Sequence, residues 1–392
     1  MSSINILHAS DLHISPDYCL RSSIDRLSDV DDPWDFSVQG VRGKGKAGYD
    51  SVKAFIKKTA SSHHPGVLES LAEFIYANSK ARAGAEEISA ATRLDCVMLS
   101  GDLATTGRKG DIEQVRKFLS SSPNPKYPHK SNDPHYREAT LAAAGIPIIF
   151  LPGNHDRFQP TNTPYNGVPI VFAPGGTLFD GLGADYRKQP VQKTTVPSQG
   201  GIQGLKVMIL TADFSLRKLG DHDGRYGWLA QGRAIGQDYQ SVLDDLTAET
   251  RNVKTHKGTD DVLCILWGIH FPPFFPGIKS TNRLIGEAAF VKAATQEGVH
   301  GILSGHTHEQ LTYANPGLPC PVFCCGTTTQ YEPRAMPGGS EQSNLLKGNT
   351  FQILNVSGDG SEGVRVVPHH YRVFGINDGS GQLLWQWRRV PT

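Results

Sequence analysis

Five short apolar segments of the chain each end in polar residues of a restricted set. The clearest covers residues 148–151, where an apolar run of the length of a buried strand stops at Pro152-Gly153 and is followed by Asn154-His155-Asp156. A surface turn explains one such ending, since Asn, Asp and Gly are the usual turn residues. It explains five of them poorly. The other four segments cover residues 4–10, 94–100, 262–269 and 299–304, and they end in Asp11-Leu12-His13, Gly101-Asp102, His270 and Gly305-His306-Thr307-His308.

Segments with the apolar spacing of amphipathic helices lie between these predicted strands. The spacing predicts helices over residues 50–59, 66–80, 111–120, 228–246 and 288–297, and a further strand over 205–211. Strands that alternate with helices form a largely parallel sheet, and the ligands of such sheets gather beyond the carboxyl ends of the strands. We therefore expect the five polar endings to meet at one edge.

Two segments rich in Pro, Gly and polar residues, 15–65 and 157–204, interrupt this alternation. Each begins at the end of a predicted strand, so we expect insertions that shape the pocket of a single domain, 1–392. The C-terminal part, 311–392, has apolar runs separated by Gly, Asn, Asp and Ser, which predicts a β-rich region. Its expected strands cover residues 311–314, 321–325, 351–356, 364–374 and 383–387.

Composition narrows the class of protein. Lys and Arg total 39 and Asp and Glu total 38 in the 392 residues, and a net charge of +1 argues against a large binding surface for nucleic acid. No apolar run approaches the roughly 20 residues of a membrane-spanning helix, and the N-terminus has no pattern of a secretory signal. Six cysteines in a chain of this length do not make a disulfide framework. We expect a cytoplasmic protein without a membrane partner.

Several other residues of metal-binding type are interpreted as structural. His8 lies inside a predicted strand and is expected to be a hydrogen-bonded core histidine, and the Trp385 and Trp387 rings are expected to pack on one sheet face. Adjacent cysteines in a strand point to opposite faces, so Cys324 and Cys325 are expected to be small buried residues and not ligands of one metal. Two further groups are assigned to solvated loops or turns: His63-His64 and Asp221-His222-Asp223.

The residues at the five strand endings form a consistent ligand set. In extended backbone the side chains at positions i and i+2 share one side, so Asp11 with His13, and His306 with His308, are expected to face a common point. Two carboxylates, four imidazoles and one amide oxygen suit Mn, Fe, Zn or Ni, and not calcium or a thiolate site. Seven ligands are too many for one cation and suit two, if one carboxylate bridges them.

This ordered set resembles the calcineurin-like metallophosphoesterases over residues 11–308. The resemblance implies an α/β fold, a four-layer α/β/β/α sandwich of two mixed β-sheets flanked by helices. It implies two transition metal ions, with Mn or an Fe/Mn pair favoured. The first ion would be held by Asp11, His13, Asp102 and His308, and the second by Asp102, Asn154, His270 and His306.

The resemblance also implies roles for the residues around the ions. His155 would lie over the site as an electrophile or proton donor, and Asp156 would orient it. The chain differs from many members at Thr105, where the pattern Gly-Asp-x-x-Asp has a second carboxylate that is not a direct ligand. Two cations about 3.5–4 Å apart can share a hydroxide that attacks phosphorus, so no covalent enzyme intermediate is needed. The chain has no phosphate-binding loop and no Gly-x-Ser-x-Gly elbow.

The expected substrate is a small molecule. The segments Gly101-Asp102-Leu103-Ala104-Thr105-Thr106-Gly107 and Ile269-His270-Phe271-Pro272-Pro273 look most similar to the cyclic-nucleotide phosphodiesterase branch of the family. We therefore expect hydrolysis of a phosphodiester in a nucleotide-like substrate. The alternatives are a phosphomonoesterase, a DNA nuclease of the same fold, and a metal-dependent scaffold without chemistry. Phe271, Phe274 and Phe275 are open to two interpretations, stacking on a base and packing as an apolar lid.

Overall fold

The structure is a computed structural model. It describes residues 3–14, 63, 65–79, 93–105, 107, 109–120, 140–160, 164–165, 168–169, 172–173, 176–196, 204–215, 232–258, 261–273, 282–313, 320–329, 350–359, 363–377 and 383–390. The predicted helix over 50–59, the Asp221-His222-Asp223 triplet, His64, Phe274 and Phe275 lie outside these residues.

The first of two large sheets has the strand order β16-β15-β14-β1-β2-β3. β1 (Ser3–Ala9), β2 (Cys96–Leu99) and β3 (Ile148–Phe150) run parallel to one another. On the other side of β1 the sheet continues antiparallel through β14 (Thr350–Asp359), β15 (Gly363–Asn377) and β16 (Leu383–Arg389). The last three strands of the chain therefore complete the sheet that its first strand begins.

The second sheet has the order β12-β13-β11-β10-β9-β8. Its inner strands are parallel, and an antiparallel strand closes each edge. The strands are β8 (Val191–Val196), β9 (Leu205–Ala212), β10 (Val262–Gly268), β11 (Gly301–Ser304), β12 (Leu311–Tyr313) and β13 (Val322–Cys324). Both sheets are mixed, and the β-rich part after residue 311 is divided between them.

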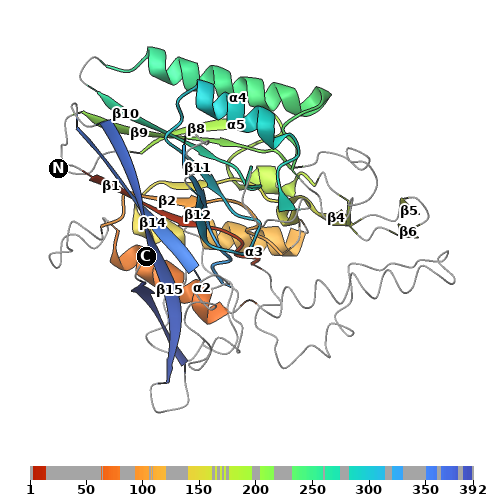
Figure 1. Cartoon of the computed structure of the whole chain (residues 1–392). Coiled ribbons are helices and arrows are strands. Elements are labelled where there is room, and N and C mark those ends of the chain that lie inside the picture. Colours follow the sequence, from red (N-terminus) through yellow and green to blue (C-terminus); the bar gives the residue numbers. More distant parts are fainter. Residues whose placement is uncertain are drawn as a thin grey trace.

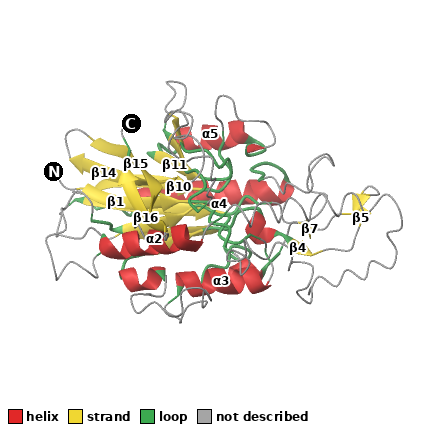
Figure 2. Cartoon of the chain, turned by 90° about the horizontal axis from the view of Figure 1, so that it is seen from below, coloured by secondary structure: helices red, strands yellow, loops and turns green. Residues whose placement is uncertain are grey.

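The helices cover the outer faces of the two sheets. α2 (Pro65–Ala77) and α3 (Lys109–Leu119), with the short helix η4 (Leu141–Ala144), share an apolar cluster with the first sheet. α4 (Gln237–Thr255) and α5 (Glu287–Gln296) share another with the second sheet. A third cluster, which includes Ile6, Ile209 and Leu266, fills the space between the sheets. These layers, seen in Figures 1 and 2, confirm the expected α/β/β/α sandwich.

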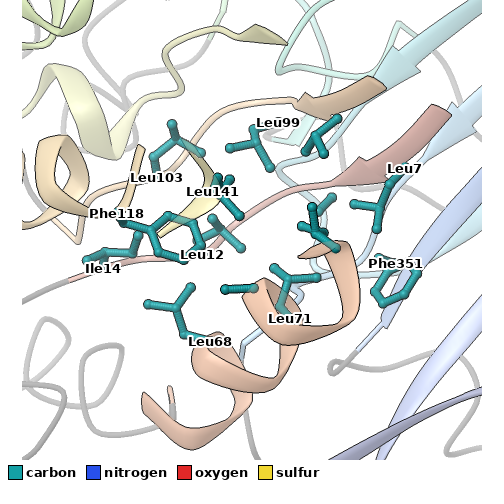
Figure 3. Close-up of a cluster of buried hydrophobic side chains, with 14 of the residues drawn as sticks. Leu7, Leu12, Ile14, Leu68, Leu71, Leu99, Leu103, Phe118, Leu141 and Phe351 are labelled. Carbon is teal, nitrogen blue, oxygen red and sulfur yellow. The ribbon is translucent and has the colours of Figure 1, made fainter. Parts of the chain in front are cut away.

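The sequence of β1 explains why this strand lies at the centre. Ile4 and Ile6 point into the core between the sheets, while Leu7 and Ala9 point toward α2, so the strand is apolar on both faces. The cluster under α2 continues past the end of the strand, because Leu12 and Ile14 join it (Figure 3). Leu12 is fully buried, which contributes about 1.5–3 kcal/mol to folding and anchors the segment that carries Asp11 and His13.

Most predicted elements are confirmed within a few residues. The helix expected over 228–246 is placed wrongly, since α4 covers Gln237–Thr255. Gly232 and Arg233 form β-bridges instead, and Gly236 precedes the helix with φ of +104°. The segment 157–204 is also more than an excursion, because it contributes β8. It further holds the short helix η6 (Leu178–Leu182) and two small hairpin pairs, β4 (Gln159–Pro160) with β7 (Phe172–Ala173) and β5 (Pro164–Tyr165) with β6 (Val168–Pro169).

None of the helices in the described part of the chain is long and apolar enough to cross a membrane.

Candidate metal centre

The nine residues predicted for the site follow the carboxyl ends of five strands. Asp11 and His13 follow β1, Asp102 follows β2, and His270 follows β10. Asn154, His155 and Asp156 come after β3, where a short helix η5 (His155–Arg157) begins, and His306 and His308 follow β11. Because the parallel strands of both sheets end on the same side, segments nearly 300 residues apart in sequence come into contact.

Asp11, His13 and His308 form one group of possible ligands, with ligand atoms that all lie within 4.8 Å of one another. The Nε2 atoms of His13 and His308 are 3.4 Å apart, and Nε2 of His308 is 3.3 Å from Oδ1 of Asp11. Asp11 and His13 are fully buried, whereas the His308 side chain is 37% exposed. Oδ1 of Asp11 is buried and accepts no hydrogen bond from the described residues. A buried carboxylate oxygen without a donor is in a suitable state to bind a cation.

Asp102, His270 and His306 form a second group with the same spacing. Nε2 of His270 is 3.3 Å from Oδ2 of Asp102 and 3.1 Å from Oδ1 of Asn154. Asp102 also belongs to a third group, with His13 and His155. Its carboxylate thus lies between the two sets of histidines, which is the position of a bridging ligand.

The backbone at these ligands is unusual. Asp11, His13, Asp102, His306 and His308 all have φ between +46° and +70°, and they are the only non-glycine residues of the described chain with positive φ. The expectation of extended backbone at Asp-x-His and His-x-His is therefore wrong: the side chains converge from left-handed turns. Such residues cost of order 1–3 kcal/mol each, and they cluster at functional sites where the surrounding structure holds them.

Three glycines make room for the same residues. A Cβ on Gly101 would collide with the His270 ring, one on Gly153 with the Asp102 carboxylate, and one on Gly305 with Ser10 and with Oδ2 of Asp11. The glycines of the motifs therefore have a steric function, because each lets a ligand pack directly on backbone.

Burial and charge set the protonation of the histidines. Burial lowers the pKa of His13 well below its ordinary value, and burial together with the nearby His270 lowers the pKa of His306 to about 3. Both imidazoles are therefore neutral at pH 7 and have a lone pair for a metal. Burial also opposes a charge on His270, but the adjacent Asp102 carboxylate outweighs it and raises the pKa to about 9. A cation at this position would replace that proton, so the donor set fits a divalent metal.

His155 and Asp156 differ from the expectation that one orients the other. Nδ1 of His155 donates a hydrogen bond to the Thr105 carbonyl at 2.8 Å, which leaves Nε2 for the centre. The Asp156 carboxylate instead accepts three backbone N–H groups, from Gly153, Leu103 and Ala104. Asp156 therefore braces the loops after β2 and β3, and burial together with the charge of Asp102 raises its pKa to about 7.

His63 lies at the centre and not in a solvated loop, so its interpretation from the sequence is wrong. Its side chain is 3% exposed, its ring lies 4.7 Å from that of His13, and Nδ1 is 2.7 Å from Oγ1 of Thr329. The sequence around it is polar and has no periodicity, so only the contact with a residue 266 positions away reveals its place.

Other residues near the centre also lacked a sequence signal. Arg157 is 0% exposed, and its guanidinium donates to the Gly176 carbonyl and to the carboxylates of Asp180 and Asp213. This network ties the chain after Asp156 to the second sheet.

Phe271 is 1% exposed and packs in the core with its ring 4.9 Å from that of His306, which favours the packing interpretation for this residue.

The structural interpretations of His8 and the cysteines are confirmed. His8 is buried and hydrogen-bonded to Oγ of Ser100 and to the Gln352 amide. Cys324 and Cys325 are both 0% exposed and belong to different apolar clusters, Cys324 to the one under α4 and α5 and Cys325 to the one under α2. Trp387 is buried and Trp385 packs beside it on the cluster under α2.

Solved structures with a similar course of the chain were found at low identity. A dimetal phosphatase from Danio rerio is 11% identical, with a TM-score of 0.41 and coverage of 93% of this chain and 98% of that one. GAP50, the anchor in the inner membrane complex of Plasmodium, is 10% identical, with a TM-score of 0.40 and coverage of 100% and 89%. The phosphopantetheinyl hydrolase PptH of Mycobacterium tuberculosis is 14% identical, with a TM-score of 0.31 and coverage of 70% and 92%. No match was found among curated proteins.

A family model decides the classification. The model of the calcineurin-like phosphoesterases matches residues 4–310, which is most of the chain and contains every residue of the two ligand groups. The chain therefore belongs to the calcineurin-like phosphoesterase family.

Proposed function

We propose that this protein is a metal-dependent phosphodiesterase that hydrolyses a small nucleotide-like ester. The observation that carries the proposal is the position of Asp102, whose carboxylate shares one group of ligand atoms with His270 and His306 and another with His13 and His155. One residue common to two sets of ligands is the arrangement that two adjacent cations need.

Each half of the centre would hold one ion. Asp11, His13 and His308 would complete one site with Asp102, and Asn154, His270 and His306 would complete the other with the same carboxylate. Mixed nitrogen and oxygen ligands suit manganese, iron, zinc or nickel, and the resemblance to the family favours manganese, or iron with manganese. When bound, the pair of ions supplies Lewis acidity and lowers the pKa of a water toward neutrality.

His155 is the residue we assign to proton transfer. Its ring is fixed by the Thr105 carbonyl and by contacts with the rings of His13 and Phe158, at 4.5 and 4.8 Å between centroids. Since Nδ1 is occupied as a donor to Thr105, we assign proton transfer to Nε2. A protonated Nε2 can donate to a phosphoryl oxygen or to the departing alkoxide, and the fixed ring needs no reorientation to do so.

The state of Arg157 fits a diester. Arg157, the cation that directly follows Asp156, is neutralised by Asp180 and Asp213 and is fully buried, so it offers no charge to a substrate. A diester has one negative charge where a monoester has up to two, and it needs less positive charge in the protein. The resemblance of the segments around Asp102 and His270 to cyclic-nucleotide phosphodiesterases adds to this preference.

A hydrolysis panel on the purified, manganese-loaded chain tests the proposal. The substrates are bis-p-nitrophenyl phosphate, p-nitrophenyl phosphate, cyclic AMP and single-stranded DNA. We expect the diesters to be hydrolysed with the higher kcat/KM, and cyclic AMP among them. Preference for p-nitrophenyl phosphate would favour a phosphomonoesterase, and degradation of DNA would favour a nuclease. Full metal loading without turnover of any ester would favour a scaffold. Cell fractionation tests the expected cytoplasmic location.

A further inference from the structure

The segment that carries Asp11 and His13 is held from one side by three consecutive buried threonines. Thr327, Thr328 and Thr329 follow β13 and are all 0% exposed. Oγ1 of Thr327 donates to the Asp11 carbonyl at 3.0 Å, and Oγ1 of Thr329 donates to the Leu12 carbonyl at 2.6 Å. Thr328 forms two hydrogen bonds with Ser10. Its Oγ1 accepts the Ser10 N–H, and its backbone N–H donates to the Ser10 carbonyl.

The opposite side of this segment is held by the loop after β2. The N–H groups of Asp11 and His13 donate to the carbonyls of Gly101 and Asp102, and Oγ1 of Thr105 donates to the His13 carbonyl. Each carbonyl from Ser10 to His13 thus has a donor, and three of the four donors are threonine hydroxyls. Because a left-handed backbone cannot form regular ladder bonds, side-chain hydroxyls replace the partners that a strand would supply.

His63 completes this support. The single proton of the Thr329 hydroxyl is donated to Leu12, so toward His63 the oxygen must accept, and Nδ1 of His63 must have the proton. That places His63 in the neutral tautomer with hydrogen on Nδ1, consistent with a pKa that burial lowers well below the ordinary value. Its ring, fixed in this way, packs at 4.7 Å on the His13 ring with an angle of 57° between the planes.

His270, in the other half of the centre, is positioned in a different way. His270 is 1% exposed and its Nδ1 donates to the Ser100 carbonyl at 2.7 Å, so the backbone directly after β2 orients the ring. Asn154 and Asp102 are 4% and 1% exposed. Both halves contain a partly exposed histidine, His306 or His308, and left-handed residues, but only in the half with Asp11 do two buried ligands, Asp11 and His13, share one left-handed turn.

We propose that His63 and Thr329 are positioning residues that hold His13 and the Asp11–His13 turn in place for one of the two metal ions, and not for the other. The inference rests on the proposed two-ion function and goes beyond it, because it assigns a selective role to residues that are not ligands. Outer groups that orient ligands typically contribute 10–100-fold to metal affinity.

The test is a calorimetric titration of Mn²⁺ into the full-length, metal-free chain, with metal content per chain measured after dialysis. His308→Ala identifies the binding step of the Asp11 half. We expect His63→Ala and Thr329→Val to weaken this step about 10–100-fold and to leave the other step within about twofold. Thr250→Val is the matched control. Thr250 is an equally buried threonine of α4, whose hydroxyl donates to the Leu246 carbonyl and accepts the indole N–H of Trp267 in β10.

Two replacements of His63 separate positioning from simple packing. In His63→Asn the side-chain amide would lie near the position of the His63 Nδ1 atom and could donate to Thr329. In His63→Gln the longer side chain would bring its amide near the position of Nε2. We expect His63→Asn to restore most of the affinity of the affected step and His63→Gln to restore less. Both should unfold at similar temperatures, so that the difference reports positioning.

The outcomes distinguish the two proposals. Identical binding steps in wild type, His63→Ala and Thr329→Val would overturn the positioning role, as would an equal loss at both steps that matches the loss in Thr250→Val. A wild-type chain that binds two ions, shows the selective loss and yet hydrolyses no phosphoester would overturn the proposed function and support the positioning role.

Discussion

The two halves of the metal centre are built by different means. In the half with Asn154 and His270, the buried His270 ring lies against Gly101 and donates to the Ser100 carbonyl, so backbone atoms position it directly. The half with Asp11 and His13 depends on a turn in left-handed conformation, which hydroxyl groups from a distant segment hold in place. Both arrangements depend on residues far apart in sequence, but a backbone carbonyl holds the ligand in the first and side-chain hydroxyls hold the turn in the second. Ligands of the same chemical type can thus differ in the kind of group that positions them.

The largest effect is expected at the residue that the halves share. Asp102→Asn keeps a side-chain oxygen that can accept the backbone N–H of His155, and it removes the negative charge between the two sets of histidines. We expect loss of both binding steps, and a fall in turnover beyond the ~10²–10⁴-fold expected for the removal of one acid–base group. Metal content and kcat measure this. A variant that keeps one tightly bound ion would show that Asp102 belongs to a single half.

His155→Ala separates chemistry from metal binding. Since His155 lies beside His13 and the shared Asp102 but is assigned to proton transfer, we expect both ions to remain and kcat to fall about 10²–10⁴-fold. The measurement is kcat with bis-p-nitrophenyl phosphate beside metal content. Because an activated leaving group needs less protonation, p-nitrophenyl esters should show a smaller loss than an alkyl diester such as cyclic AMP. Equal losses on both substrates would assign His155 to charge stabilisation alone, and full activity would remove it from the site.

The glycines next to the ligands test whether the halves respond separately. A methyl group at Gly101 would press on the His270 ring, whereas one at Gly305 would press on Asp11 and Ser10. We expect Gly101→Ala to weaken mainly the Mn²⁺-binding step of the His270 half, and Gly305→Ala mainly that of the Asp11 half. Each affinity should fall about 10–100-fold, which is the size of effect seen when the orientation of a ligand is disturbed.

The control for these two variants is Gly145→Ala. Gly145 has φ of +65° and open space around its Cβ position, so alanine there costs about 1–2 kcal/mol of stability through the backbone alone. Metal binding should not change. If Gly101→Ala and Gly305→Ala gave the same pattern of losses, the two halves would act as one unit.

The sequence predicted the parts of the centre that depend on local pattern. Apolar runs that stop at glycine marked the ends of β2, β3 and β11, and alternation with helices placed those ends together. The left-handed turns were not predictable, because aspartate and histidine in this conformation differ in no visible way from the same residues in extended backbone. The four-layer arrangement came from the resemblance and not from periodicity.

Long-range contacts account for the remaining differences. His63 is surrounded by polar residues in sequence, and its burial depends on Thr329 and His13, which no local pattern connects to it. The start of α4 was misplaced because the apolar residues before Gly236 continue the helical spacing, while tertiary bridges at Gly232 and Arg233 take that backbone out of the helix. Local pattern predicts where an element can form, and packing decides where it begins.

The smallest effect concerns the support of the His270 half. His8 bonds Oγ of Ser100, whose carbonyl orients His270, and burial lowers the His8 pKa to about 3. A histidine that is harder to protonate when folded stabilises the fold above its unfolded pKa of about 6.5, and this contribution is lost as the pH falls toward 3. For His8 alone the loss between pH 7 and pH 5 is about 2 kcal/mol.

Denaturant unfolding of the metal-free chain at pH 7, 6 and 5 measures this contribution. His8→Gln removes the titrating ring and keeps an amide near Ser100, so its free energy of unfolding should fall less with acidification than that of the wild type, by about 2 kcal/mol. His256→Gln, at an exposed histidine that ends α4, should behave as the wild type. Parallel curves for wild type and His8→Gln would mean that His8 is not held neutral in the fold.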